Sequence, residues 1–174
     1  MKLDAVVLAA LAFTGVAFAQ GAPNDAQIAH IVVTANQVDI DAGKLAESMA
    51  SSPEVKKFGK DMVRDHTGVN KSAVDLVTRL KVTPEDNPTA MSLKKGGTDN
   101  VDALKTMKGK AFDKAYIDHE VAYHEQVLEA MDKTLIPGAK NDELKALLVK
   151  VRPAFASHLA HAKMLQTKMM SSMD

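Results

Sequence analysis

The chain has 174 residues and carries 22 basic and 22 acidic side chains, with no cysteine. This balance of charge provides no polybasic cluster for nucleic acid or anionic lipid. The lack of cysteine excludes disulfides and thiolate metal sites, and it argues against lipid attachment through an N-terminal cysteine.

The first residues are typical of a secretory signal peptide. Lys2 precedes an uncharged run over residues 5–17, and Ala17-Phe18-Ala19 matches the small-residue cleavage pattern. We predict cleavage after Ala19, so that residues 1–19 are the signal peptide and residues 20–174 form one exported domain. The uncharged run is too short to span a bilayer, and we expect no transmembrane segment after it.

The remaining chain has apolar residues three and four positions apart, which is the spacing of amphipathic helices. This spacing predicts four long helices, over residues 25–49, 53–80, 110–135 and 142–170. Ser52 and Pro53 fit the N-cap and first position of the second helix. Pro137-Gly138 is expected to end the third helix. Because the turn between the first two helices is short, we expect them to be antiparallel neighbours.

Residues 81–109 interrupt this pattern with Pro84, Pro88 and Gly96-Gly97. We predict a mostly irregular connection with one short helix over residues 101–107. Its length would allow it to cross the bundle, as the single long crossover of ferritin-like folds does. The predicted fold class is therefore all-α: a ferritin-like four-helix bundle with a long connection between the second and third helices.

One polar residue lies near the midpoint of each predicted helix: Asp39, His66, His124 and His158. Each is within about two residues of its midpoint, and a helix rises about 1.5 Å per residue, so these residues are expected at one level of the bundle. Three imidazoles and one carboxylate would suit a zinc or copper ion. Glu120 shares a helix face with His124 and would be a fifth ligand or would orient an imidazole.

The other histidines are expected to lie apart from this cluster. With about 3.6 residues per turn, His119 lies about 140° from His124, whereas His161 lies about 60° from His158 and is a marginal candidate. His30 is near the start of its helix. Asp65 points about 100° away from His66, so we expect it at the surface or as a hydrogen-bond partner of a ligand.

The sequence lacks the motifs of familiar enzymes. Ferritin-like di-iron sites need Glu-x-x-His pairs, but Val63, Val121 and Phe155 stand three residues before the midplane histidines. There is no Gly-rich phosphate loop and no serine–histidine–acid motif. We therefore do not expect an iron-storage ferroxidase, and a metal-dependent enzyme would need an open coordination position.

Two alternatives remain open. In a structural or interaction module without metal, the buried histidines would be satisfied by Tyr116, Tyr123, Asp39 or Glu120. The C-terminal methionines would bind cuprous copper, line a groove for a partner helix or fill the core. These methionines are Met164, Met169, Met170 and Met173. A homo-oligomer or an unidentified envelope partner is compatible with either function.

Three motifs carry a resemblance to a known family. They are Phe58-x-x-x-Met62-Val63-x-Asp65-His66-Thr67-x-x-Asn70, Ala111-Phe112-Asp113-x-Ala115-Tyr116-Ile117 followed by His124, and Arg152-Pro153-x-x-x-x-His158-Leu159-x-x-Ala162. In order and spacing they resemble the exported bacterial domain-of-unknown-function family 4142, through nearly all of the chain after residue 19.

This resemblance implies a ferritin-like four-helix bundle and no established activity. The family pattern usually carries Glu near position 39 and His at positions 66, 124 and 158, so Asp39 shortens one arm by a carbon. Members are often labelled outer-membrane proteins, but a helical bundle without an apolar span or lipid anchor cannot reside within that membrane. We predict a soluble periplasmic protein that serves metal handling or envelope stress.

Overall fold

The computed structural model describes residues 22–171. Its long helices are α1 (Asp25–Met49), α2 (Pro53–Arg79), α3 (Pro88–Lys105), α4 (Gly109–Ala130) and α6 (Asp142–Ser171). A π-helical turn, η1 (Met131–Leu135), leads from α4 into the short α5 (Ile136–Gly138). The described part of the chain is therefore all-α, as predicted. The predicted signal peptide lies outside the described residues.

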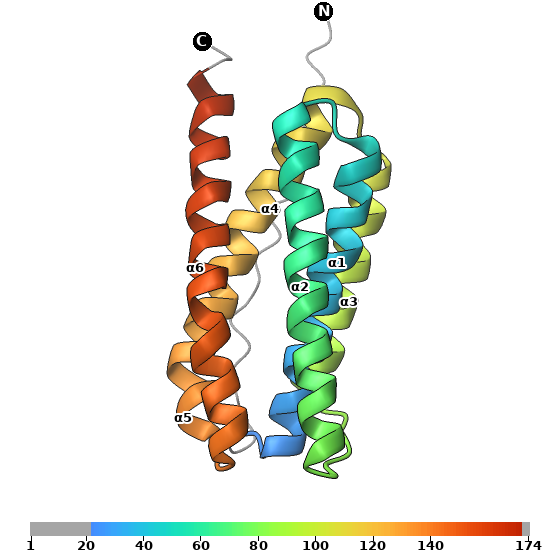
Figure 1. Ribbon diagram of the computed structural model, residues 1–174. Helices are drawn as coiled ribbons and strands as arrows, with labels where there is room; N and C mark the ends of the chain where they lie inside the picture. The colour runs from blue at the N-terminus through green and yellow to red at the C-terminus, as the bar shows by residue number, and fades with distance from the viewer. Residues whose placement is uncertain (1–21, 172–174) are drawn as a thin grey trace, which may run out of the picture.

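Each long helix runs along the molecule in the direction opposite to the long helix before it in the chain (Figure 1). Helix α1 packs against α2, α4 packs against α6, and α3 lies against the other side of α1. The four predicted helices correspond to α1, α2, α4 with η1, and α6. No helix in the described range is long and apolar enough to cross a membrane.

Side chains cap the helices where the sequence indicates. The Asn24 side chain accepts a hydrogen bond from the backbone nitrogen of Gln27, and the Gln27 side chain accepts one from the backbone nitrogen of Asn24. The Ser52 hydroxyl accepts a hydrogen bond from the backbone nitrogen of Val55. Such caps satisfy backbone donors that have no partner inside the helix. The predicted N-cap at Ser52 is thus confirmed.

The predicted irregular connection over residues 81–109 was wrong, because α3 fills most of it. Asn87 caps this helix by accepting from the backbone nitrogen of Ala90 at 2.9 Å, and Pro88 occupies its first turn, where proline is favoured. Gly97 lies against Val38 of α1, and a Cβ atom at Gly97 would come within 2.6 Å of that side chain. This glycine therefore permits close packing of two helices.

Asp113 of α4 holds the turn between α1 and α2. Its carboxylate accepts hydrogen bonds from the backbone nitrogens of Ser51 and Ser52, both at 2.8 Å, and from the Ser51 hydroxyl at 2.5 Å. The Asp113 side chain is buried. This contact joins residues far apart in the sequence and fixes α4 against the first helical pair.

The apolar core is divided into two clusters. One cluster includes Ile28, Leu76, Leu128 and Leu148 and lies near the start of α1. The other includes Phe58, Phe112, Tyr116 and Leu165 and lies near the end of α1. Six buried polar residues stand between them along the helices: Asn36, Asp39, His66, Glu120, His124 and His158. The fold therefore places a layer of buried polar residues between two apolar clusters.

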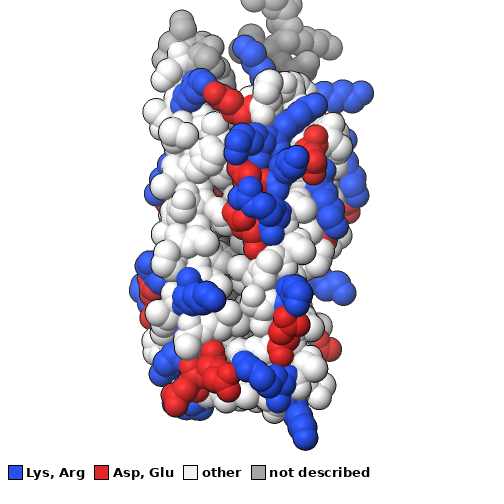
Figure 2. Space-filling model, in the orientation of Figure 1, with Lys and Arg blue, Asp and Glu red and all other residues white. Residues whose placement is uncertain are grey.

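Charged side chains are mixed on the molecular surface. Figure 2 shows acidic and basic side chains interspersed over the face that it presents. Ion pairs at 2.6 Å join α6 to α2 through Lys168 and Glu54, and α6 to α4 through Lys163 and Glu125. Exposed pairs of this kind contribute at most about 1 kcal/mol each, so the helices are held mainly by their apolar faces.

Candidate metal centre

Three imidazole rings from three helices meet at the middle of the molecule. His66 in α2, His124 in α4 and His158 in α6 have ring centroids 5.1 to 5.7 Å apart. One nitrogen atom from each ring lies within 4.8 Å of the corresponding atoms of the other two rings. His66 and His124 are 0% exposed and His158 is 8% exposed. The predicted convergence is therefore present in the structure.

Asn36 in α1 orients the His66 ring. The Nδ1 atom of His66 lies 2.7 Å from the Oδ1 atom of Asn36, and the Asn36 amide donates to the Val32 carbonyl at 2.8 Å. Because the amide nitrogen is engaged elsewhere, the Asn36 oxygen faces the imidazole and accepts a hydrogen bond from Nδ1. Nδ1 of His66 is then the donor, and Nε2 carries a free lone pair.

The other two rings are oriented in the same way by different acceptors. Nδ1 of His124 donates to the Glu120 backbone carbonyl at 3.0 Å, and Nε2 of His158 donates to the Asp65 carboxylate at 3.1 Å. The opposite ring nitrogens are Nε2 of His66, Nε2 of His124 and Nδ1 of His158. All three are buried and have no hydrogen-bond partner among the described residues. One nitrogen held by a protein acceptor and the other left free is the usual arrangement of a metal-binding histidine.

Burial keeps these imidazoles neutral. Burial, with a smaller contribution from the neighbouring histidines, lowers the pKa of His66 well below its usual value and that of His124 to about 4. Burial also lowers the pKa of His158, although Asp65 partly opposes this effect. At neutral pH each ring is therefore unprotonated on its free nitrogen, as a metal ligand must be.

Two carboxyl groups lie beside the imidazoles. Asp39 in α1 and Glu120 in α4 are 1% and 0% exposed. The Oδ2 atom of Asp39 lies 3.5 Å from Nε2 of His66, and the Oε2 atom of Glu120 lies 3.5 Å from Nδ1 of His124. Asp39, Glu120 and His124 also form a second set of potential ligand atoms within 4.8 Å of one another.

The two carboxyl groups lack ordinary hydrogen-bond donors. None of their four oxygen atoms has a well-formed hydrogen bond within the described part of the chain. Burial raises the pKa of Asp39 well above its usual value and that of Glu120 to about 8, and the Glu120 carboxyl raises the pKa of Asp39 further. Two facing, buried carboxyls hold a proton between them unless another cation is present. This environment suits a bound cation.

The tyrosines do not satisfy the histidines. The Tyr123 hydroxyl donates to the Ala35 carbonyl at 3.0 Å, and the Tyr116 hydroxyl is buried without a well-formed hydrogen bond among the described residues. One nitrogen of each ring does have an acceptor, but these acceptors are Asn36, the Glu120 backbone carbonyl and Asp65, and none is a side chain named in the metal-free alternative. Nε2 of His66, Nε2 of His124 and Nδ1 of His158 have no partner among the described residues.

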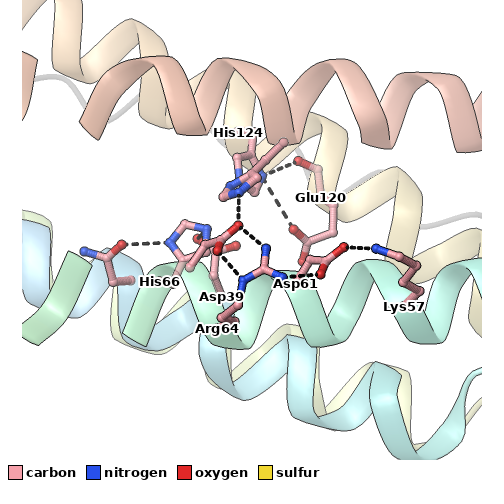
Figure 3. Close-up of polar contacts among 10 residues, drawn as sticks. Asp39, Lys57, Asp61, Arg64, His66, Glu120 and His124 are labelled. Atoms are coloured by element: carbon pink, nitrogen blue, oxygen red, sulfur yellow. Dashed lines mark hydrogen bonds and ion pairs between the residues drawn. The ribbon is translucent and has the colours of Figure 1, made fainter. Parts of the chain in front are cut away.

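A chain of charged residues on α2 borders the centre (Figure 3). Arg64 bridges Asp61 at 2.8 Å and Asp65 at 2.7 Å, and Lys57 pairs with Asp61 at 2.6 Å. The Asp65 side chain is 33% exposed, whereas its partner His158 is almost buried. Asp65 was expected at the surface or as a hydrogen-bond partner of a candidate ligand, and it is partly exposed and accepts from His158.

His30 and His119 lie outside the cluster, as predicted, and so does His161, which was a marginal candidate. The His119 ring stacks on Tyr123, and the His161 ring packs on the edge of Phe58. Nδ1 of His30 lies 3.1 Å from the Glu85 carbonyl. These three residues therefore provide natural controls for experiments on the central histidines.

Sequence reasoning missed Asn36. The residue lies one turn before Asp39 on the same buried face of α1, which is the one available signal. Its role depends on the position of α2, because its partner His66 is 30 residues away in sequence.

The fold and the site define an all-helical protein with a buried cluster of three histidines and two carboxyls. The chain belongs to the DUF4142 family, which is described as a domain of unknown function. The model of this family matches residues 12–165. No curated protein matches the sequence. A solved structure, CopM in the Cu(II)-bound form, is similar in fold, with a TM-score of 0.66 and 17% sequence identity. The similarity covers 85% of this chain and 99% of the CopM chain.

Proposed function

We propose that this protein is an exported periplasmic metal-binding protein and that His66, His124 and His158 bind one copper or zinc ion. The observation that carries this proposal is the set of three buried ring nitrogens without partners, each opposite a nitrogen that donates to the protein. Leaving three such acceptors unpaired in a dry interior would be costly. A metal ion would use all three lone pairs.

Asp39 and Glu120 would complete the site. In their ionised forms they would offset the charge of a divalent cation and occupy the coordination positions that the imidazoles leave open. Imidazole and carboxylate ligands are compatible with both zinc and divalent copper. The fold likeness to CopM, a protein solved with Cu(II), favours copper as the first metal to test.

The four helices that carry these residues, α1, α2, α4 and α6, would form the ferritin-like four-helix core, with α3 added against α1. Export through a signal peptide cleaved after Ala19 would place the protein in the periplasm. Its role there would be metal handling or protection of the envelope under stress. No step of catalysis is included in this proposal.

Titration of the purified protein with Cu(II) and Zn(II) tests the proposal, with calorimetry and melting temperature as measurements. We expect one tightly bound ion per chain and a higher melting temperature, because a ligand of the native state stabilises it by mass action. The His66→Ala, His158→Ala double variant should lose this ion. The matched control is His30→Ala, His161→Ala, which removes two imidazoles outside the cluster.

Equal metal binding by both double variants would reject the site. In that case ordered water would satisfy the three ring nitrogens, and the histidines would serve only to fix the packing of the helices. A metal-free protein whose melting temperature is unchanged by either metal would support that alternative.

A further inference from the structure

A cavity of about 500 Å³ lies beside the metal centre, toward the start of α1. Four helices and η1 surround it, since its lining comes from α1, α3, α4, η1 and α6. Apart from Asn36, its buried walls are mainly apolar. They are formed by Ile31, Val32, Met131, Leu135, Leu148 and Phe155. A cavity of this size and composition is typical of a site for a small organic molecule.

The cavity opens between α3 and α4. Ser92 of α3 and Gln126 of α4 line it and are exposed, so this side reaches solvent. The lining includes two charged residues, Glu129 and Lys133, which are exposed and pair with each other at 2.6 Å. The opening therefore presents no net charge to an incoming molecule.

The inner end of the cavity is uncharged as well. The Asn36 amide accepts from His66 and donates to Val32, and the Tyr123 hydroxyl donates to Ala35 while keeping lone pairs that can accept. An ionic ligand would lose its hydration there without gaining a charged partner. The chemistry of the walls favours a neutral, largely apolar molecule with at most one hydrogen-bonding group.

The π-helical turn η1 forms one wall. Met131, Thr134 and Leu135 of this turn all line the cavity. Single π-helical turns within α-helices are rare and are frequent at functional sites. The irregular turn is thus located where the helix faces the cavity.

We propose that this cavity is a binding site for a small, neutral, apolar organic molecule, separate from the metal site. A docked helix would need an open groove about 10 Å wide, whereas helices enclose this space on several sides. The proposal does not rest on metal binding, although Phe155 contributes to both places: its ring lines the cavity and packs 4.9 Å from that of His66.

The test uses N-phenyl-1-naphthylamine, a neutral apolar probe whose fluorescence rises in apolar surroundings. We expect saturable binding of one probe per chain. Ala130→Phe, on the cavity wall, should weaken binding by at least about tenfold because it occupies the space of the probe. Val127→Phe provides a second filling variant if the first does not fold. The control is Ala122→Phe, the same substitution at an exposed position of α4 that does not line the cavity.

Absence of saturable binding, or equal binding by the filling variants and the control, would overturn the proposal. Binding of one probe per dimer would also overturn it, because a second copy of the chain would then occupy this face. Sedimentation velocity would detect such a dimer. Cu(II) titration of Ala130→Phe should match that of the unmodified protein, which separates this site from the metal site.

Discussion

The Nε2 atom of His66 lies 3.5 Å from the Oδ2 atom of Asp39, and neither atom has a hydrogen-bond partner among the described residues. Nδ1 of His66 already donates to Asn36, so Nε2 is an acceptor unless the ring gains a second proton. When Asp39 is ionised, a neutral imidazole and a carboxylate oxygen thus face each other as two acceptors. A metal cation between them would resolve this arrangement.

Asn36 should control the metal affinity through His66. Asn36→Leu removes the acceptor that fixes the ring, and we expect a loss of about 10- to 100-fold in affinity, as for other partners of metal-bound histidines. Asn36→Asp retains an acceptor oxygen and should restore most of the affinity. Calorimetric titration with Cu(II) measures both variants. Equal affinities for the leucine variant and the unmodified protein would contradict this role.

Asp65 should support His158 in a similar way. Asp65→Asn weakens the acceptor for Nε2 of His158, and we expect a loss of about tenfold in metal affinity. Asp61→Asn is a matched control, because Asp61 also pairs with Arg64 but has no hydrogen bond to a histidine. If both variants lost affinity equally, the effect would come from surface charge and not from orientation of the ring.

The metal-free protein should become less stable between pH 6.5 and pH 8. Burial raises the pKa of Glu120 to about 8 in the folded state, whereas in the unfolded chain it is near 4.5. The folded state therefore holds a proton that the unfolded state has released, and its stability falls as pH rises toward 8. The effect of Glu120 over this range is on the order of 2 kcal/mol.

The buried histidines have the opposite effect at lower pH. Burial lowers the pKa of His124 to about 4, so below pH 6.5 the unfolded chain takes up a proton that the folded state excludes. The contribution of His124 to the free energy of unfolding is therefore present above pH 6.5 and is lost as pH falls toward 4. Denaturant unfolding with a chelator present measures the profile. Glu120→Gln should reduce the loss of stability between pH 6.5 and 8, whereas an unchanged slope in this variant would contradict the assignment.

Asp113 should be important for stability alone. Asp113→Ala removes the buried carboxylate that accepts from the backbone nitrogens of Ser51 and Ser52, and we expect a loss of roughly 3 kcal/mol in the free energy of unfolding. Asp99→Ala, which breaks an exposed pair with Lys95, should cost less than about 0.5 kcal/mol. Urea denaturation of both variants tests this difference.

The sequence predicted the positions of His66, His124 and His158 because helical periodicity sets the face of each residue and the rise per residue sets its level. The bounds of α1 were likewise predicted at Asp25–Met49. The prediction failed at α3, where proline and glycine are local signals of a break. The favourable placement of Pro88 at a helix start and the packing of Gly97 on Val38 depend on tertiary contacts.

The orientation of the rings could not be predicted. Which nitrogen of a histidine is free depends on its acceptor, and the acceptors Asn36 and Asp65 come from neighbouring helices. Periodicity places a side chain on a face, but it does not give the rotation of the ring. The metal assignment therefore remains a prediction from chemistry, supported by this geometry.

The most direct test of the metal site is the number of imidazole nitrogens bound to Cu(II), measured by pulsed electron paramagnetic resonance on the loaded protein. We predict three imidazole ligands in the unmodified protein and two in His66→Gln, with no change in His161→Ala. A spectrum with a single imidazole, or one that His66→Gln leaves unchanged, would contradict binding of the metal by His66, His124 and His158.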